Sequence, residues 1–82
     1  MRLNRREYAI LRAVAAGRGM LVAFCEPDLV VDGGWCDHRA VHRLLELGLI
    51  TAEQQVPFGQ QARAMVTRSG ADVLAGTPDL VA

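Results

Sequence analysis

The stretch that decides the fold is DHRAVHRLLELG, residues 37–48, together with the run that follows it to residue 67. Its apolar side chains recur at the spacing of one helical face, and we expect the following to be buried: Ala40, Val41, Leu44, Leu45 and Leu47. Asp37 is a good N-cap residue, and Gly48 stands where helices commonly end in a left-handed conformation. The sequence therefore predicts a helix over residues 37–47.

Two strands and a short helix are predicted after Gly48. Residues 49–55 and 61–66 read as strands joined by a turn at 56–60, where Pro57 and Gly59 both suit a bend. Successive side chains of a strand point to opposite faces of the sheet. In the second strand one face would carry Ala62, Ala64 and Val66, and the other Gln61, Arg63 and Met65. Thr67 would cap a helix over about 68–75, and that helix would add these residues to the core: Ala71, Val73 and Leu74.

The chain before this stretch is expected to contain a helix and a hairpin. Residues 4–17 form an amphipathic pattern in which Asn4 and Glu7 make a capping box, with Leu3 and Tyr8 as its hydrophobic staple. Residues 20–25 and 29–31 are apolar runs three residues apart, which is typical of a β-hairpin. A single helical turn near residues 26–30 is the alternative for this part.

Two short motifs in this chain resemble the winged helix-turn-helix family. They are LLELGLI at residues 44–50, which in the family closes the recognition helix, and TRSG at 67–70, which follows the wing. The chain resembles the small MarR- and PadR-like members of this family. The resemblance implies an α+β fold in the order helix, β-hairpin, helix, β-hairpin (wing), short helix. One domain would span residues 1–76, with 77–82 as a flexible tail. Residues 18–36 depart from the family, which has a helix there.

Composition and charge narrow the classes of protein. Hydrophobic residues make up 51% of the 82, which argues against disorder, and no apolar run approaches the ~20 residues of a membrane span. The N-terminus lacks a signal-peptide pattern, so we expect a cytoplasmic protein in which Cys25 and Cys36 are reduced and buried. The net charge is zero, but residues 1–18 carry five arginines and one glutamate, whereas 19–37 carry four acids and no base.

The outward face of helix 37–47 is the strongest candidate for a site. His38, Arg39, His42 and Arg43 share a side of the helix by their spacing. In a winged helix this face would read DNA, with Arg39 and Arg43 reaching bases or phosphates and the two histidines supporting them. Arg63 and Arg68 would hold the flanking backbone. The leading hypothesis is thus a small transcriptional regulator that binds double-stranded DNA as a homodimer, and the alternative for this face is an ordinary solvated surface.

A protein-binding role is the second hypothesis. Glu26, Asp28 and Asp32 precede the helix and would present a negative surface to a basic partner, unless they only serve turns and caps. Phe58 at the wing tip and Trp35 are candidate anchors, although we expect Trp35 to fold back over the core. Phage or mobile-element inhibitors of the anti-CRISPR kind resemble winged helices and act in this way on a host protein.

Catalysis and metal binding have little support in the sequence. No phosphate-binding glycine loop is present, and no serine, histidine and acid stand in a familiar order, so we expect no enzyme and no cofactor. The cysteines and histidines are spaced Cys-x10-Cys-x-His-x3-His, which matches no common zinc site. We therefore predict no metal.

Overall fold

The computed structural model describes residues 2–76, which form an α+β fold. Its elements follow one another in this order: α1 (Arg5–Ala15), β1 (Gly19–Val22), β2 (Asp28–Val31), β3 (Gly34–Trp35), α2 (His38–Glu46), β4 (Ile50–Ala52), β5 (Gln61–Val66) and α3 (Arg68–Ala75). The five strands make one antiparallel sheet in the order β3-β2-β1-β5-β4. The predicted α+β class is confirmed at this level. None of the helices described is long and apolar enough to cross a membrane.

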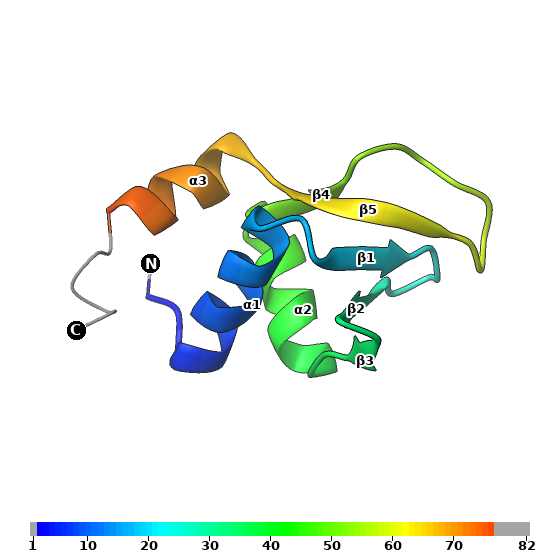
Figure 1. The fold of residues 1–82 in the computed structure, drawn as a ribbon, viewed down its shortest axis with the longest axis horizontal. Helices are drawn as coiled ribbons and strands as arrows, with labels where there is room; N and C mark the ends of the chain where they lie inside the picture. Colours follow the sequence, from blue (N-terminus) through cyan, green and yellow to red (C-terminus); the bar gives the residue numbers. More distant parts are fainter. Residues whose placement is uncertain (1, 77–82) are drawn as a thin grey trace.

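The core lies between the sheet and two of the helices. Figure 1 shows α1 and α2 side by side on one face of the sheet, while α3 continues from β5 beyond one end of it. The largest side chains that are fully buried are aliphatic: Leu11, Leu29, Leu44, Leu49 and Val41. Each contributes roughly 1.5–3 kcal/mol by leaving water, so this small domain depends on aliphatic packing.

The start of α1 is fixed by the predicted capping box. The Glu7 backbone N–H donates to Asn4 Oδ1 at 2.8 Å, and the Asn4 backbone N–H donates to Glu7 Oε1 at 2.8 Å. Leu3 and Tyr8 are both buried in the same core cluster, as expected of a hydrophobic staple. These contacts place the first turn of α1, with its arginines, firmly against the rest of the domain.

Helix α2 agrees with the prediction at both ends. Asp37 caps it by accepting the N–H groups of Arg39 and Ala40, and Gly48 adopts the left-handed conformation with φ +70°. The prediction that Leu47 is buried was wrong, because this side chain is 38% exposed. Leu47 is the C-cap residue, where the chain turns away through Gly48, and so it leaves the buried face of the helix.

The hairpin of β1 and β2 is confirmed, but β1 ends at Val22 and not at residue 25, and a further strand extends the hairpin. Met20 pairs with Val30, and the short strand β3 then pairs with β2 across the turn Asp32-Gly33. Both turn residues have positive φ, +52° and +82°, which is the geometry of a two-residue hairpin loop. The Asp-Gly pair was the sequence signal for β3, and the alternative of a helical turn near residues 26–30 was wrong.

Three side chains of this region, those of Trp35, Cys25 and Cys36, are more exposed than predicted. Trp35 does not fold over the core; it lies on the edge strand β3 and is 66% exposed. Cys25 is an exposed thiol in the turn after β1, while Cys36 is half-buried, and burial raises the pKa of the Cys36 thiol. The two cysteines are not bonded to each other.

The second hairpin is built from β4 and β5 and joins the sheet through β1. The strand β5 has its predicted bounds and its predicted alternation of buried and exposed residues, whereas β4 is shorter than the predicted strand. The tip of the β4–β5 hairpin is bonded to the turn after β1, since Ala23 N–H donates to Gln60 O at 2.9 Å and Gly59 N–H donates to Ala23 O at 2.7 Å. In α3 Val73 and Leu74 pack against the core, but Ala71 is exposed, contrary to expectation. The predicted tail, 77–82, lies outside the described residues.

The TRSG motif fastens α3 to the end of α2. Thr67 Oγ1 donates to Gly48 O at 2.6 Å and accepts from Gly70 N–H at 3.0 Å. Gly70 itself is buried so closely that a Cβ there would lie 2.2 Å from Leu49 O and 2.6 Å from Val66 Cγ1. A glycine is therefore required at position 70 by lack of space.

We predict that Gly70→Ala destabilises the domain by at least about 2 kcal/mol, because the backbone oxygen of Leu49 cannot move without disturbing β4. In an open helix the same change would instead stabilise by up to about 1 kcal/mol. Urea unfolding followed by circular dichroism measures the difference. Gly34→Ala is the control, since its Cβ would meet no atom closer than 3.7 Å. Equal stabilities of the two variants would contradict the close approach at Gly70.

Candidate functional site

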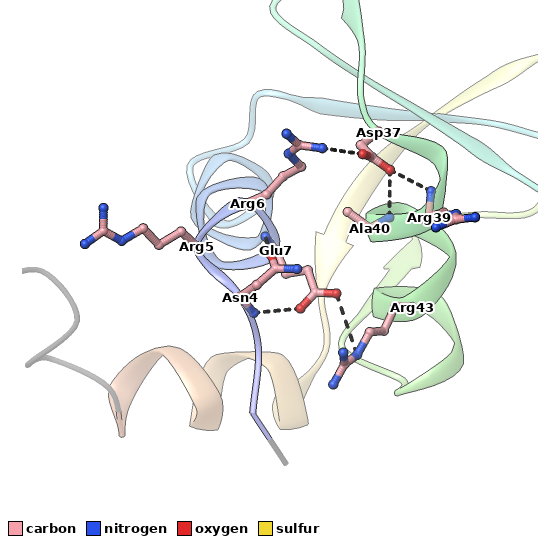
Figure 2. Close-up of a pocket in the computed structure, with 8 residues that line it drawn as sticks. All are labelled: Asn4, Arg5, Arg6, Glu7, Asp37, Arg39, Ala40 and Arg43. Carbon is pink, nitrogen blue, oxygen red and sulfur yellow. Dashed lines mark hydrogen bonds and ion pairs between the residues drawn. The ribbon is translucent and has the colours of Figure 1, made fainter.

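An open hollow of about 460 Å³ lies between the N-terminal ends of α1 and α2. Figure 2 shows the residues that line it: Asn4, Arg5, Arg6, Glu7, Asp37, Arg39, Ala40 and Arg43. We refer to Arg5, Arg6, Arg39 and Arg43 as the arginine cluster. Four guanidinium groups thus surround the hollow with only two carboxylates, which gives this end of the domain a positive balance.

Glu7 is the carboxylate at the base of the hollow, and it is only 3% exposed. Its Oε1 accepts the Asn4 N–H, and its Oε2 lies 3.6 Å from Arg43 Nε on α2. Arg43 also donates through Nη2 to the backbone oxygen of Arg2 at 2.8 Å. Arg43 is therefore used to join α2 to the start of α1, and its charge is partly balanced.

Asp37 forms the second link between the two helices. Its Oδ1 accepts the N–H groups of Arg39 at 2.8 Å and Ala40 at 3.2 Å, while its Oδ2 accepts a hydrogen bond from Arg6 Nη1. The hydrogen bond from the Ala40 backbone, followed by that from Arg6, holds the pKa of the Asp37 carboxyl below its ordinary value. The charge of Asp37 is thus committed to the cap of α2.

The other two members of the arginine cluster face solvent. Within residues 2–76, Arg5 and Arg39 form no ion pair with a carboxylate, and both side chains are exposed. Figure 2 shows them extending outward on opposite sides of the hollow. These two guanidinium groups can bind an anionic partner without breaking an ion pair between described residues.

The histidines of α2 belong to a different set of contacts. His38 Nδ1 lies 2.8 Å from Asp28 Oδ1, and His42 Nε2 lies 2.8 Å from Glu46 Oε1. Glu26 Oε1 is within reach of both rings, 3.7 Å from His38 Nε2 and 3.8 Å from His42 Nδ1. We call these five residues the histidine–carboxylate cluster. The hydrogen bond to Asp28 raises the pKa of His38, with Glu26 acting in the same direction.

The predicted DNA-reading face of α2 is therefore divided into two parts. His38 and His42 face the turn before β2, whereas Arg39 and Arg43 line the hollow. Arg43 reaches Glu7 and Arg2 on the α1 side, while Arg39 extends outward (Figure 2). The predicted set shares a helix but does not form one continuous surface.

The two arginines expected to hold flanking DNA lie away from the hollow. Arg63 is exposed on β5 beside Gly17, at the C-terminal end of α1, about 16 Å along that helix from its first turn. Arg68 is exposed at the start of α3, which Thr67 ties to Gly48 at the end of α2. By contrast, Arg6 belongs to the hollow although we had not proposed it. The excess of arginine in residues 1–18 was the signal for it.

The residues proposed for a protein partner are also distributed over several places. Asp32 pairs with Arg18 at 2.5 Å, and Asp28 with His38, so part of the negative charge is balanced within the chain. Phe58 at the hairpin tip is 73% exposed, and its ring meets that of Phe24 edge-on, with centroids 5.5 Å apart. The exposed aromatic side chains are thus the features of this set that most need a partner.

Comparisons with known proteins add no assignment: no family model, no curated protein and no solved structure matches the chain. Across residues 2–76, no group of three or more histidine, cysteine, aspartate or glutamate side chains is arranged to hold a metal ion.

We predict that Arg43→Ala lowers the free energy of unfolding by about 1–3 kcal/mol, since it leaves the buried Glu7 carboxylate without its cation. Arg39→Ala on the same helix is the matched control and should change stability by less than about 0.5 kcal/mol. Adding Glu7→Gln to Arg43→Ala should recover part of the loss, because no buried charge is then left unpaired. Chemical denaturation of the three variants measures these differences. If Arg39→Ala costs as much as Arg43→Ala, Glu7 does not link the helices as described.

Proposed function

We propose that this domain binds double-stranded DNA through the arginine cluster and the exposed side of α2, as a small winged-helix transcriptional regulator. The observation that carries the proposal is the gathering of four arginines from two helices around one open hollow, with Arg5 and Arg39 both unpaired among the described residues. Arginine is suited to phosphate because its planar guanidinium donates two parallel hydrogen bonds.

The arrangement of the elements supports this proposal. Helix α2 packs against α1 with one side and keeps another exposed, and the hairpin of β4 and β5 follows it in the chain, which is the order that a wing requires (Figure 1). The N-terminal half of α2, which carries Arg39, lies at the hollow, and in a helix-turn-helix the N-terminal residues of the recognition helix contact the bases. The arginines of α1 would then contact the neighbouring phosphates.

A net charge of zero does not oppose this proposal, because the charges are segregated. The arginine cluster surrounds the hollow with four positive groups, whereas Asp32 is paired with Arg18 and Asp28 lies against His38 on the hairpin side of α2. Only the local potential at the contact surface, over about one Debye length of 8–10 Å, acts on a bound phosphate.

We expect binding to a mixed-sequence DNA duplex that weakens steeply with salt. If all four arginines of the cluster contact phosphates, the slope of log affinity against log salt is about −3 to −4, or roughly a 100-fold loss between about 50 and 200 mM. Fluorescence anisotropy with a labelled duplex pool measures both quantities. No binding at the lower salt concentration would disprove the proposal.

Substitutions distinguish DNA binding through the arginine cluster from nonspecific attraction of DNA to any exposed arginine. The double change Arg5→Ala with Arg39→Ala should reduce the slope by about 2, since it removes the two positive charges of the cluster that have no carboxylate partner among the described residues. Arg12→Ala is the matched control, because Arg12 is exposed on α1 but does not line the hollow. If Arg12→Ala weakens binding as much per arginine removed, the DNA does not contact the hollow.

The exposed aromatic side chains favour a second candidate function, which is binding to another protein. A ring that is 73% exposed, as in Phe58, and an edge-strand Trp35 that is 66% exposed are costly to leave in water, and both residue types are frequent anchors of interfaces. A mobile-element inhibitor of a host protein would use such anchors.

This second candidate predicts a stoichiometric protein partner that survives nuclease treatment. Pull-downs from a nuclease-treated host lysate should then lose the partner with Phe58→Ser or Trp35→Ser, but keep it with Arg39→Ala. Loss of the same partner with Arg39→Ala alone would place the contact on the arginine cluster instead. The absence of any stoichiometric partner, together with salt-dependent DNA binding, would leave only the first proposal.

A further inference from the structure

We propose that the histidine–carboxylate cluster makes DNA binding by this domain depend on pH, with protonation of His38 raising the affinity. This inference rests on the proposed function, because it concerns the regulation of the same surface of α2. Both clusters have members on the short helix α2, and His38 and Arg39 are consecutive residues of its first turn. A change of charge on His38 therefore takes place next to an arginine proposed to contact DNA.

The geometry surrounds each imidazole with carboxylates on both nitrogens. His38 has Asp28 at 2.8 Å on Nδ1 and Glu26 at 3.7 Å on Nε2. His42 has Glu26 at 3.8 Å on Nδ1 and Glu46 at 2.8 Å on Nε2. The two rings are stacked with centroids 6.2 Å apart, and both side chains are about half exposed, so protons reach them from solvent.

The charged groups that face the two rings come from three places. Glu26 comes from the turn before β2, Asp28 is the first residue of β2, and Glu46 lies on α2 itself. No arginine among the described residues pairs with these three carboxylates. With neutral rings the cluster carries three negative charges, which repel a phosphate backbone approaching α2. A proton gained by His38 removes one unit of that repulsion.

The sign of the effect follows from the direction of the His38 pKa. The Asp28 hydrogen bond raises it above the ordinary value, so the ring is charged throughout the acidic range and loses its proton at a pH above about 6.5. Stabilisation by the His38–Asp28 contact is accordingly present at low pH and is lost as the pH rises through the raised pKa. DNA affinity should decrease over the same interval.

The experiment compares duplex binding at about pH 6 and about pH 8, at one low ionic strength, for the wild type and His38→Gln. For each protein the measured quantity is the ratio of the DNA affinity at the lower pH to that at the higher pH. We expect this ratio to be about threefold larger for the wild type than for His38→Gln, as appropriate for one exposed charge. Asp28→Asn should move the wild-type transition to lower pH, because it removes the partner that raises the pKa of His38. A titration of the ring protons by NMR locates the transition directly, since the chain has only two histidines.

The outcomes distinguish this inference from the proposed function. If the wild type and His38→Gln bind DNA at both pH values and their affinity ratios are equal, the inference is overturned and the proposed function stands. An NMR midpoint of His38 that does not respond to Asp28→Asn also overturns it. No binding at either pH overturns the proposed function and the inference with it. A larger ratio for the wild type, with a midpoint lowered in Asp28→Asn, supports the inference.

Discussion

The structure of the candidate site depends on one buried carboxylate, that of Glu7. It is the only charged side chain buried among the described residues, and it is used twice, by Asn4 in the cap of α1 and by Arg43 from α2. Isolated burial of a carboxylate is unfavourable, so the position of Arg43 is constrained by the need to balance that charge. The helix pair is in this way held at the spacing that leaves an open hollow between its N-terminal ends, and the remaining arginines surround that hollow.

A single short helix separates the two kinds of charge. Because consecutive residues of α2 are turned by about 100°, Arg39 and Arg43 line the hollow while His38 and His42 lie toward the hairpin. The turn that carries Glu26 meets the second pair and not the first. The same nine residues therefore present a positive surface with fixed charge and a neighbouring surface whose charge changes with pH.

Much of the fold could be predicted because its signals are local. The caps at Asn4, Asp37 and Thr67 and the left-handed Gly48 each act within a few residues, and all four have the expected geometry. The exposure of Trp35 was missed, because it depends on which strand lies at the edge of the sheet. The site was predicted only in part for the same reason. The periodicity of α2 shows which side chains leave its buried face, but not which neighbouring element each of them meets.

Zero net charge in such a chain is better understood as the sum of two opposed surfaces than as a lack of electrostatic function. If the nine arginines and nine acids were paired evenly, no part of the surface would attract an ion of either sign. Instead Arg5 and Arg39 have no carboxylate partner among the described residues, whereas the acids Glu26, Asp28 and Glu46 share two titratable rings. A charge on one surface can then be changed by a proton while the fold, which depends on Glu7 and the aliphatic core, is left almost untouched. Such a separation between the charge that holds the structure and the charge that meets a partner is what a pH-dependent binding surface requires.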